Sequence, residues 1–90
     1  MGMADIIAEK LNGAFSPQSL NIVNESHLHA GHGDHVGGES HFRVHIVSEA
    51  FNGKSRLERH RMINALLAME LRDHVHALAI HANTPDEAVR

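Results

Sequence analysis

The chain has 90 residues, of which eight are Lys or Arg and eleven are Asp or Glu, so its formal net charge is −3 with neutral histidines. This length supports one domain with a core just large enough to fold alone, and a hydrophobic content of 42% argues against a disordered chain. The net charge disfavours a typical nucleic-acid-binding protein, and the absence of cysteine excludes disulfides, thiol catalysis and thiolate metal sites within the chain.

The N-terminal part predicts a helix followed by a strand. Apolar residues recur near a 3.6-residue period over residues 5–14, and Gly13 and Ser16-Pro17 end that pattern. Residues 20–24 alternate between apolar and polar side chains, which is typical of a short strand. We expect residues 1–4 to be frayed.

Histidine is the most unusual feature of the composition, because the chain has ten. Residues 25–40 hold four histidines and four glycines and are too polar for a regular element, so we expect a long exposed loop. A connection of this length is more often functional than a short one. Imidazole titrates near physiological pH and is the commonest protein metal ligand. The first hypotheses are therefore a metal site, an iron–sulfur site or a pH-responsive surface.

The central part predicts a strand, a turn and a second helix. Apolar and polar residues alternate over residues 41–48, which gives the clearest strand of the chain. A turn follows at residues 51–53. Ser55 and Glu58 then fit a capping box, and the helix that they open should run to about Met69.

After a turn at residues 72–73, residues 75–81 predict a third strand, and residues 83–90 should be frayed. This order allows antiparallel pairing of the first two strands and a right-handed parallel crossover to the third. The expected fold is a single two-layer α+β domain, α-β-β-α-β, with a three-stranded mixed sheet over residues 1–90. Its core should include most of Phe42, Val44, Ile46, Ile63, Leu66, Leu67, Leu78 and Ile80, with Leu57 and Met69 on the apolar face of the second helix.

Several motifs resemble those of the BolA-like family. The longest is Phe51-Asn52-Gly53-Lys54-Ser55-Arg56-Leu57-Glu58-Arg59-His60-Arg61-Met62-Ile63-Asn64-Ala65-Leu66. Others occur in the same order as in the family, at Asn24-Glu25-Ser26, His41-Phe42-Arg43-Val44, Ser48-Glu49, Val75-His76-Ala77-Leu78-Ala79-Ile80 and Thr84-Pro85. The resemblance runs from about Ile6 to Ala88, looks most like the BolA1 branch, and implies a fold similar to class II KH domains.

The resemblance also implies a function. Such proteins pair with monothiol glutaredoxins, with which they can hold a [2Fe-2S] cluster. Two ligand positions carry over to this sequence: His29 in the loop between the first two strands, and His76 at the start of the last strand. The other two ligands would be thiolates from a glutaredoxin cysteine and a bound glutathione, so the isolated chain is expected to hold no cofactor. His27, His32 and His35 compete with His29 for the loop position.

Other roles for the histidines remain open. His76 lies in an apolar alternating segment, where an ordinary buried histidine is the simpler interpretation of the pattern alone. The four loop histidines and Asp34 could gather Zn²⁺, Ni²⁺ or Cu²⁺ without a partner. His60 fits helix packing or capping. Surface positions on strands or turns are expected for His41, His45, His74 and His81.

The alternative function is that of a DNA-binding stress-response transcriptional regulator, as described for some bacterial members of the family. KH domains grip a nucleic-acid backbone with a Gly-x-x-Gly loop at a helix start. The corresponding Gly53-Lys54-Ser55-Arg56 lacks the second glycine, although cations near a helix N-terminus could still meet phosphates. The candidate contacts with nucleic acid or with a protein partner are Gly53, Lys54, Ser55, Arg56, Arg59 and His60.

Catalysis and membrane association are not expected. The sequence has no cysteine nucleophile, no Gly-x-Ser-x-Gly motif and no P-loop. The N-terminus carries Asp5 and lacks the basic start of a signal peptide, and no apolar run approaches the roughly 20 residues of a membrane span. We therefore expect a cytoplasmic protein, for which a homodimer is left open.

Overall fold

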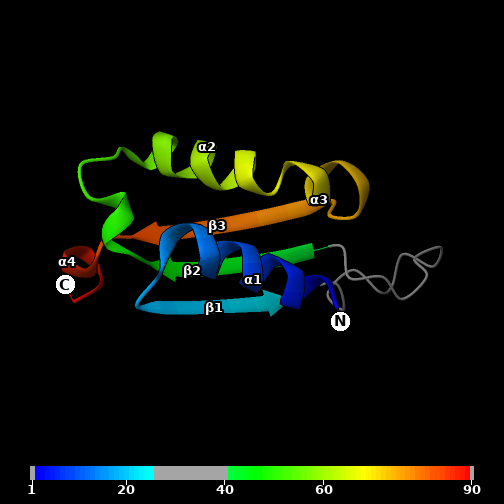
Figure 1. The fold of residues 1–90 in the computed structure, drawn as a ribbon, viewed down its shortest axis with the longest axis horizontal. Coiled ribbons are helices and arrows are strands. Elements are labelled where there is room, and N and C mark those ends of the chain that lie inside the picture. Colours follow the sequence, from blue (N-terminus) through cyan, green and yellow to red (C-terminus); the bar gives the residue numbers. More distant parts are fainter. Residues whose placement is uncertain (1, 26–40, 90) are drawn as a thin grey trace.

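A computed structural model describes residues 2–25 and 41–89 of the chain (Figure 1). The segment 25–40, expected to be a long loop, lies outside the described residues apart from Glu25. None of the helices in the described part is long and apolar enough to cross a membrane. The elements are α1 (Met3–Phe15), β1 (Ser19–Asn24), β2 (His41–Val47), the short 3-10 helix η2 (Glu49–Phe51), α2 (Arg56–Leu66), α3 (Ala68–Asp73), β3 (Ala77–Asn83) and α4 (Pro85–Ala88).

The three strands form one mixed sheet in the order β1-β2-β3. β1 pairs antiparallel with β2, with Leu20 opposite Ile46, and β2 pairs parallel with β3, with Val44 opposite Ile80. A parallel pair needs a crossover connection, and α2 and α3 provide it. The α+β fold with a three-stranded mixed sheet is confirmed.

The helices cover one face of the sheet, which is where the core lies. Figure 1 shows α1 lying over β1 and β2, nearly along their direction, and α2 running along β3. On β2 the side chains of Phe42, Val44 and Ile46 are at most 2% exposed, whereas His45 between them is exposed. Alternation along the strand therefore separates a helix-covered apolar face from an open polar face. The buried hydrophobic residues are Ile7, Leu11, Phe42, Val44, Ile46, Phe51, Ile63, Leu67, Val75 and Ala82.

The second helix differs from the prediction, because it breaks at Leu67 instead of continuing to Met69. Leu67 has φ −100° and ψ 20°, and it separates α2 from α3. Its side chain is only 1% exposed, so the break turns this leucine into the core. Leu66 is consequently half-buried, and Leu57 and Met69 are 59% and 61% exposed. Leu78 and Ile80 are also half-buried, although they pack against the core.

Both termini are more regular than expected. Met3 and Ala4 belong to α1, and Asn83 belongs to β3. Residues 85–88 form α4, which begins with Thr84 as N-cap and Pro85 at its first position, a favoured place for proline. Thr84 is 6% exposed, so the C-terminal segment is packed and not frayed at this point.

Candidate functional site

His76 lies at the end of the sheet, in the short connection between α3 and β3. The preceding residue, Val75, is 5% exposed, and its N–H donates to the carbonyl of Glu70 over 2.7 Å. The following residue, Ala77, pairs with His41 in the parallel ladder. The backbone of His76 is thus held on both sides, while its side chain is exposed and not buried as the apolar pattern alone suggested. It borders a cavity of about 260 Å³ lined also by Leu71, Arg72, Asp73, His74 and Val75.

A second histidine lies beside it. The imidazole rings of His41 and His76 are nearly parallel, at 10°, with centroids 6.1 Å apart. The expectation that His41 is merely a surface residue of the strand did not foresee this neighbour. The two rings are neighbours because β2 and β3 pair in parallel with His41 opposite Ala77, and the sequence does not reveal that register.

The two ends of the histidine-rich segment meet near this pair. Glu25 N–H donates to the carbonyl of His41 over 2.7 Å, so the chain leaves and re-enters the sheet at adjacent points. The four candidate ligands of the segment, His27, His29, His32 and His35, lie outside the described residues. Of the family-matched ligands His29 and His76, the structure therefore describes His76, at this end of the sheet.

The described residues do not form a metal site by themselves. No group of three or more His, Asp or Glu side chains in residues 2–25 and 41–89 is arranged to hold a metal ion. Exposed imidazole is nevertheless a suitable nitrogen donor. The donor set near His76 therefore fits a site that is completed by other ligands and not a cage formed by the sheet and helices.

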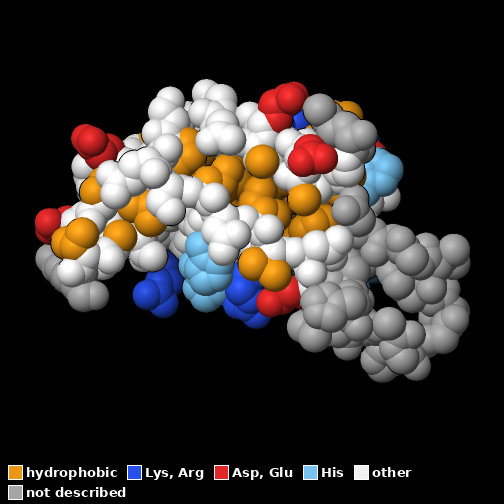
Figure 2. Space-filling view, turned by 90° about the horizontal axis from the view of Figure 1, so that it is seen from below, with side chains coloured by type: hydrophobic (Ala, Val, Ile, Leu, Met, Phe, Trp, Pro, Cys, Tyr) orange, Lys and Arg blue, Asp and Glu red, His pale blue; other side chains and the backbone are white. Residues whose placement is uncertain are grey.

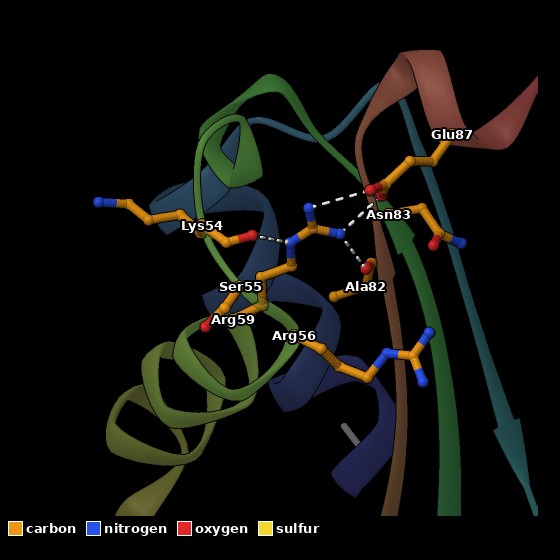
Figure 3. A pocket seen from close by; sticks show the side chains of 7 residues that line it. All are labelled: Lys54, Ser55, Arg56, Arg59, Ala82, Asn83 and Glu87. Atoms are coloured by element: carbon orange, nitrogen blue, oxygen red, sulfur yellow. Dashed lines mark hydrogen bonds and ion pairs between the residues drawn. The ribbon is translucent and has the colours of Figure 1, made fainter.

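The basic turn before α2 has the geometry that its sequence predicts. Gly53 has φ +76°, a left-handed conformation that glycine adopts without strain. Ser55 Oγ accepts from the Glu58 N–H and Glu58 Oε1 accepts from the Ser55 N–H, which confirms the capping box. Lys54 and Arg56 are exposed. A cavity of about 450 Å³ lies at this turn, lined by Lys54, Ser55, Arg56, Arg59, Ala82, Asn83 and Glu87 (Figure 3).

Arg59 points inward, unlike its neighbours on the turn. It is 8% exposed, and its guanidinium donates to the carbonyl oxygens of Lys54 and Ala82, each over 2.9 Å. Two further bonds, of 2.6 and 3.1 Å, join it to the carboxylate of Glu87 in α4 (Figure 3). We expected Arg59 among the nucleic-acid or partner contacts, but its donors are engaged within the domain. Arg59 connects α2, β3 and α4.

This ion pair predicts how acid affects stability. Hydrogen bonds from Arg59, and next from the Thr84 N–H, lower the pKa of Glu87 from 4.5 to about 2. Because the pKa of Glu87 is lowered in the folded state, the stabilisation by its carboxylate is fully present above pH 4.5 and is lost as the pH falls towards 2. The difference in free energy of unfolding between the wild type and Glu87→Gln should therefore be largest above pH 4.5 and shrink towards pH 2 in urea titrations. A difference that stays constant over this range would contradict the role of the pair.

The remaining histidines lie on the open face of the sheet and at its edge. His45 and His81 face each other across β2 and β3, with parallel rings 4.5 Å apart. Arg43 Nη1 donates to His81 Nε2 over 2.9 Å. His60 is half-buried on α2 and borders a cavity of about 230 Å³ with Arg56, Ile80, His81, Ala82 and Asn83. Figure 2 shows histidine side chains between basic ones on the side seen from below.

Comparison with known proteins identifies similarity over most of the chain. The family model described as BolA-like protein matches residues 11–87. The DNA-binding transcriptional regulator BolA of Vibrio cholerae is 47% identical over 83 residues, which cover 92% of this chain and 76% of the relative. BolA-like protein 1 of Homo sapiens is 52% identical over 79 residues, which cover 88% of this chain and 56% of the relative.

The fold is similar to solved structures as well. The BolA domain of SufE1 from Arabidopsis thaliana superposes with a TM-score of 0.85 at 45% sequence identity. The superposition covers 97% of this chain and 98% of that domain. Similarity of sequence and of fold therefore extends over the same, almost complete, length.

Proposed function

Given that this chain belongs to the BolA-like family, we propose that it is an iron–sulfur trafficking or regulatory adaptor that pairs with a monothiol glutaredoxin and shares a [2Fe-2S] cluster with it. The cluster is the cargo of this pair. The observation that carries the proposal is the presentation of His76, an exposed imidazole on a backbone held between the buried Val75 and the paired Ala77. A ligand fixed in this way needs little reorganisation when a partner brings the cluster.

The second imidazole comes from the histidine-rich segment, and His29 is the position that the family resemblance selects. In the sequence, His29 follows Glu25 by four residues, and Glu25 is bonded to the end of the sheet through the carbonyl of His41. His41 is the competing donor, because its ring lies beside His76. His27, His32 and His35 are alternatives within the same segment.

The partner supplies what this chain lacks. The sequence contains no cysteine, so both thiolates come from outside: one from glutaredoxin and one from its bound glutathione. When two imidazoles replace two thiolates on a [2Fe-2S] cluster, its reduction potential rises. Binding also becomes dependent on pH, because an imidazole must be neutral to ligate. This chain thereby alters the chemistry of a cluster that glutaredoxin already carries.

A spectroscopic titration tests the proposal. Adding the purified chain to cluster-loaded glutaredoxin should change the visible absorption and circular dichroism of the cluster and reach an end point at equimolar ratio. Parallel titrations with His29→Ala and His41→Ala distinguish the family-matched position from the neighbouring donor on β2. An unchanged cluster spectrum at excess of the wild-type chain would contradict the proposal.

DNA-binding transcriptional regulation is the second candidate function. The name of the Vibrio cholerae relative and the exposed Lys54 and Arg56 at the N-terminus of α2 favour it. Free N–H groups and the helix dipole attract phosphate at such a position. A gel shift at about 150 mM salt tests sequence-selective binding, since phosphate contacts alone weaken steeply with salt. A selective shift beside an unchanged cluster spectrum would make this the leading function.

A further inference from the structure

The open face of the sheet and the adjoining start of α2 carry a group of cationic and titratable side chains that the cluster site does not use. We define this group as the histidine patch: Arg43 and His45 on β2, His81 on β3, and Arg56 and His60 on α2. The stacked His45–His81 pair lies at its centre, 4.5 Å between ring centroids. His81 also borders the cavity that contains Arg56 and His60, so the sheet face and the start of α2 form one surface.

The charge of the patch is unbalanced. Glu25 lies beside the patch, and its carboxylate pairs with Arg43 Nε over 2.9 Å. Glu87 shares a cavity with Arg56, but its carboxylate is paired with Arg59. The patch itself has two arginines and three imidazoles, although the whole molecule is negative at −3. Positive charge is therefore concentrated on this face, and a proton taken up by one of its imidazoles would add to it.

The geometry of His81 disfavours the protonation of its own ring when nothing covers the patch. Its Nε2 accepts from Arg43, and a protonated ring would lose that hydrogen bond. Burial, and then the nearby His45 and Arg43, lower the pKa of His81, with smaller contributions from His60 and Arg56. A carboxylate placed over these rings would reverse the balance, because an opposite charge favours the protonated imidazole.

We propose that the histidine patch is a docking surface for an acidic peptide segment of a partner protein, and that it binds this segment more tightly as the pH falls. An anion fits better than a metal ion, because Arg43 already occupies the Nε2 of His81 and the described residues contain no group of three metal-ligating side chains. A short acidic peptide fits better than a nucleic acid. Bases stack on accessible aromatic rings, but of the three phenylalanines in the chain Phe42 and Phe51 are buried and Phe15 packs against Phe51. The net charge of −3 also repels a long polyanion.

The test uses a capped hexaglutamate peptide, whose carboxylates remain largely ionised at about pH 6.0. Isothermal titration at low salt, at about pH 7.5 and about pH 6.0, gives the dissociation constant, which should fall by roughly five- to thirtyfold if about one proton is taken up. Repeating the titration at the lower pH in buffers of different ionisation enthalpy measures this proton uptake directly.

His81→Gln should remove most of the proton uptake and the pH dependence, because it removes the central imidazole. The matched control is His74→Gln, which removes one exposed histidine outside the patch and should behave like the wild type. Capped hexaglutamine should not bind. Equal proton uptake by the wild type and His81→Gln, or no uptake by either, would overturn the proposal. Tighter binding of a thymidine hexanucleotide with the same pH dependence would overturn the assignment of the partner as an acidic peptide.

Discussion

His76→Ala should abolish the spectrum of the cluster shared with glutaredoxin while leaving the chain folded. His76 is the candidate ligand whose backbone the described structure fixes, between the buried Val75 and the start of β3. Removing the imidazole removes the donor that this fixed backbone presents. Its side chain is exposed, so little packing is lost, and far-ultraviolet circular dichroism and thermal unfolding should match the wild type.

His74→Ala is the matched control for this variant. His74 is also exposed and also lines the cavity beside His76, but it ends α3 instead of adjoining β3. The visible spectrum of its cluster should be close to that of the wild type. His29→Ala should give a weaker, altered cluster, since His27, His32 and His35 remain in the same segment. A wild-type spectrum for His76→Ala would contradict the assignment of His76 as a ligand.

Leu67→Ala should produce the largest loss of stability, on the order of 2–5 kcal/mol in the free energy of unfolding. Leu67 is 1% exposed at the break between α2 and α3, so its truncation leaves a cavity in the core. For a domain of this size, each 1 kcal/mol lowers the melting temperature by roughly 4–8 °C. Urea and thermal unfolding measure both quantities.

Leu57→Ala and Leu66→Ala calibrate that loss. Leu57 is 59% exposed on the same helix, so its truncation should change the free energy of unfolding by no more than about 0.5 kcal/mol. Leu66 is half-buried and should fall between the two. If Leu66→Ala proved more costly than Leu67→Ala, the described orientation of the helix end would be wrong.

The sheet and the start of α2 could be predicted from the sequence because local patterns determine them. Alternation marks β2, and Ser55 with Glu58 marks the start of α2. The break at Leu67 could not be predicted in this way, since an apolar helical pattern continues through it. Tertiary packing determines the break, because burying the Leu67 side chain in the core stabilises the domain more than an uninterrupted helix would.

The candidate site could be predicted by residue type and not by arrangement. The family resemblance selects His76 as a candidate ligand. Its proximity to His41, however, depends on the parallel pairing of β2 with β3, which sets His41 opposite Ala77. The internal contacts of Arg59 could not be predicted either. The sequence analysis placed Arg59 among the candidate nucleic-acid or partner contacts, whereas its partner Glu87 lies in α4, over residues that were expected to be frayed.

Histidines of this chain should ligate a cluster brought by glutaredoxin, and isotope labelling detects such ligation directly. The chain is prepared with ¹⁵N-histidine, combined with unlabelled cluster-loaded glutaredoxin and glutathione, reduced, and examined by pulsed electron paramagnetic resonance. We predict strong nitrogen hyperfine couplings that change from the ¹⁴N to the ¹⁵N pattern when this chain alone is labelled. The His76→Ala substitution should remove these couplings. The absence of strongly coupled nitrogen, or couplings that do not respond to labelling of this chain, would contradict the claim.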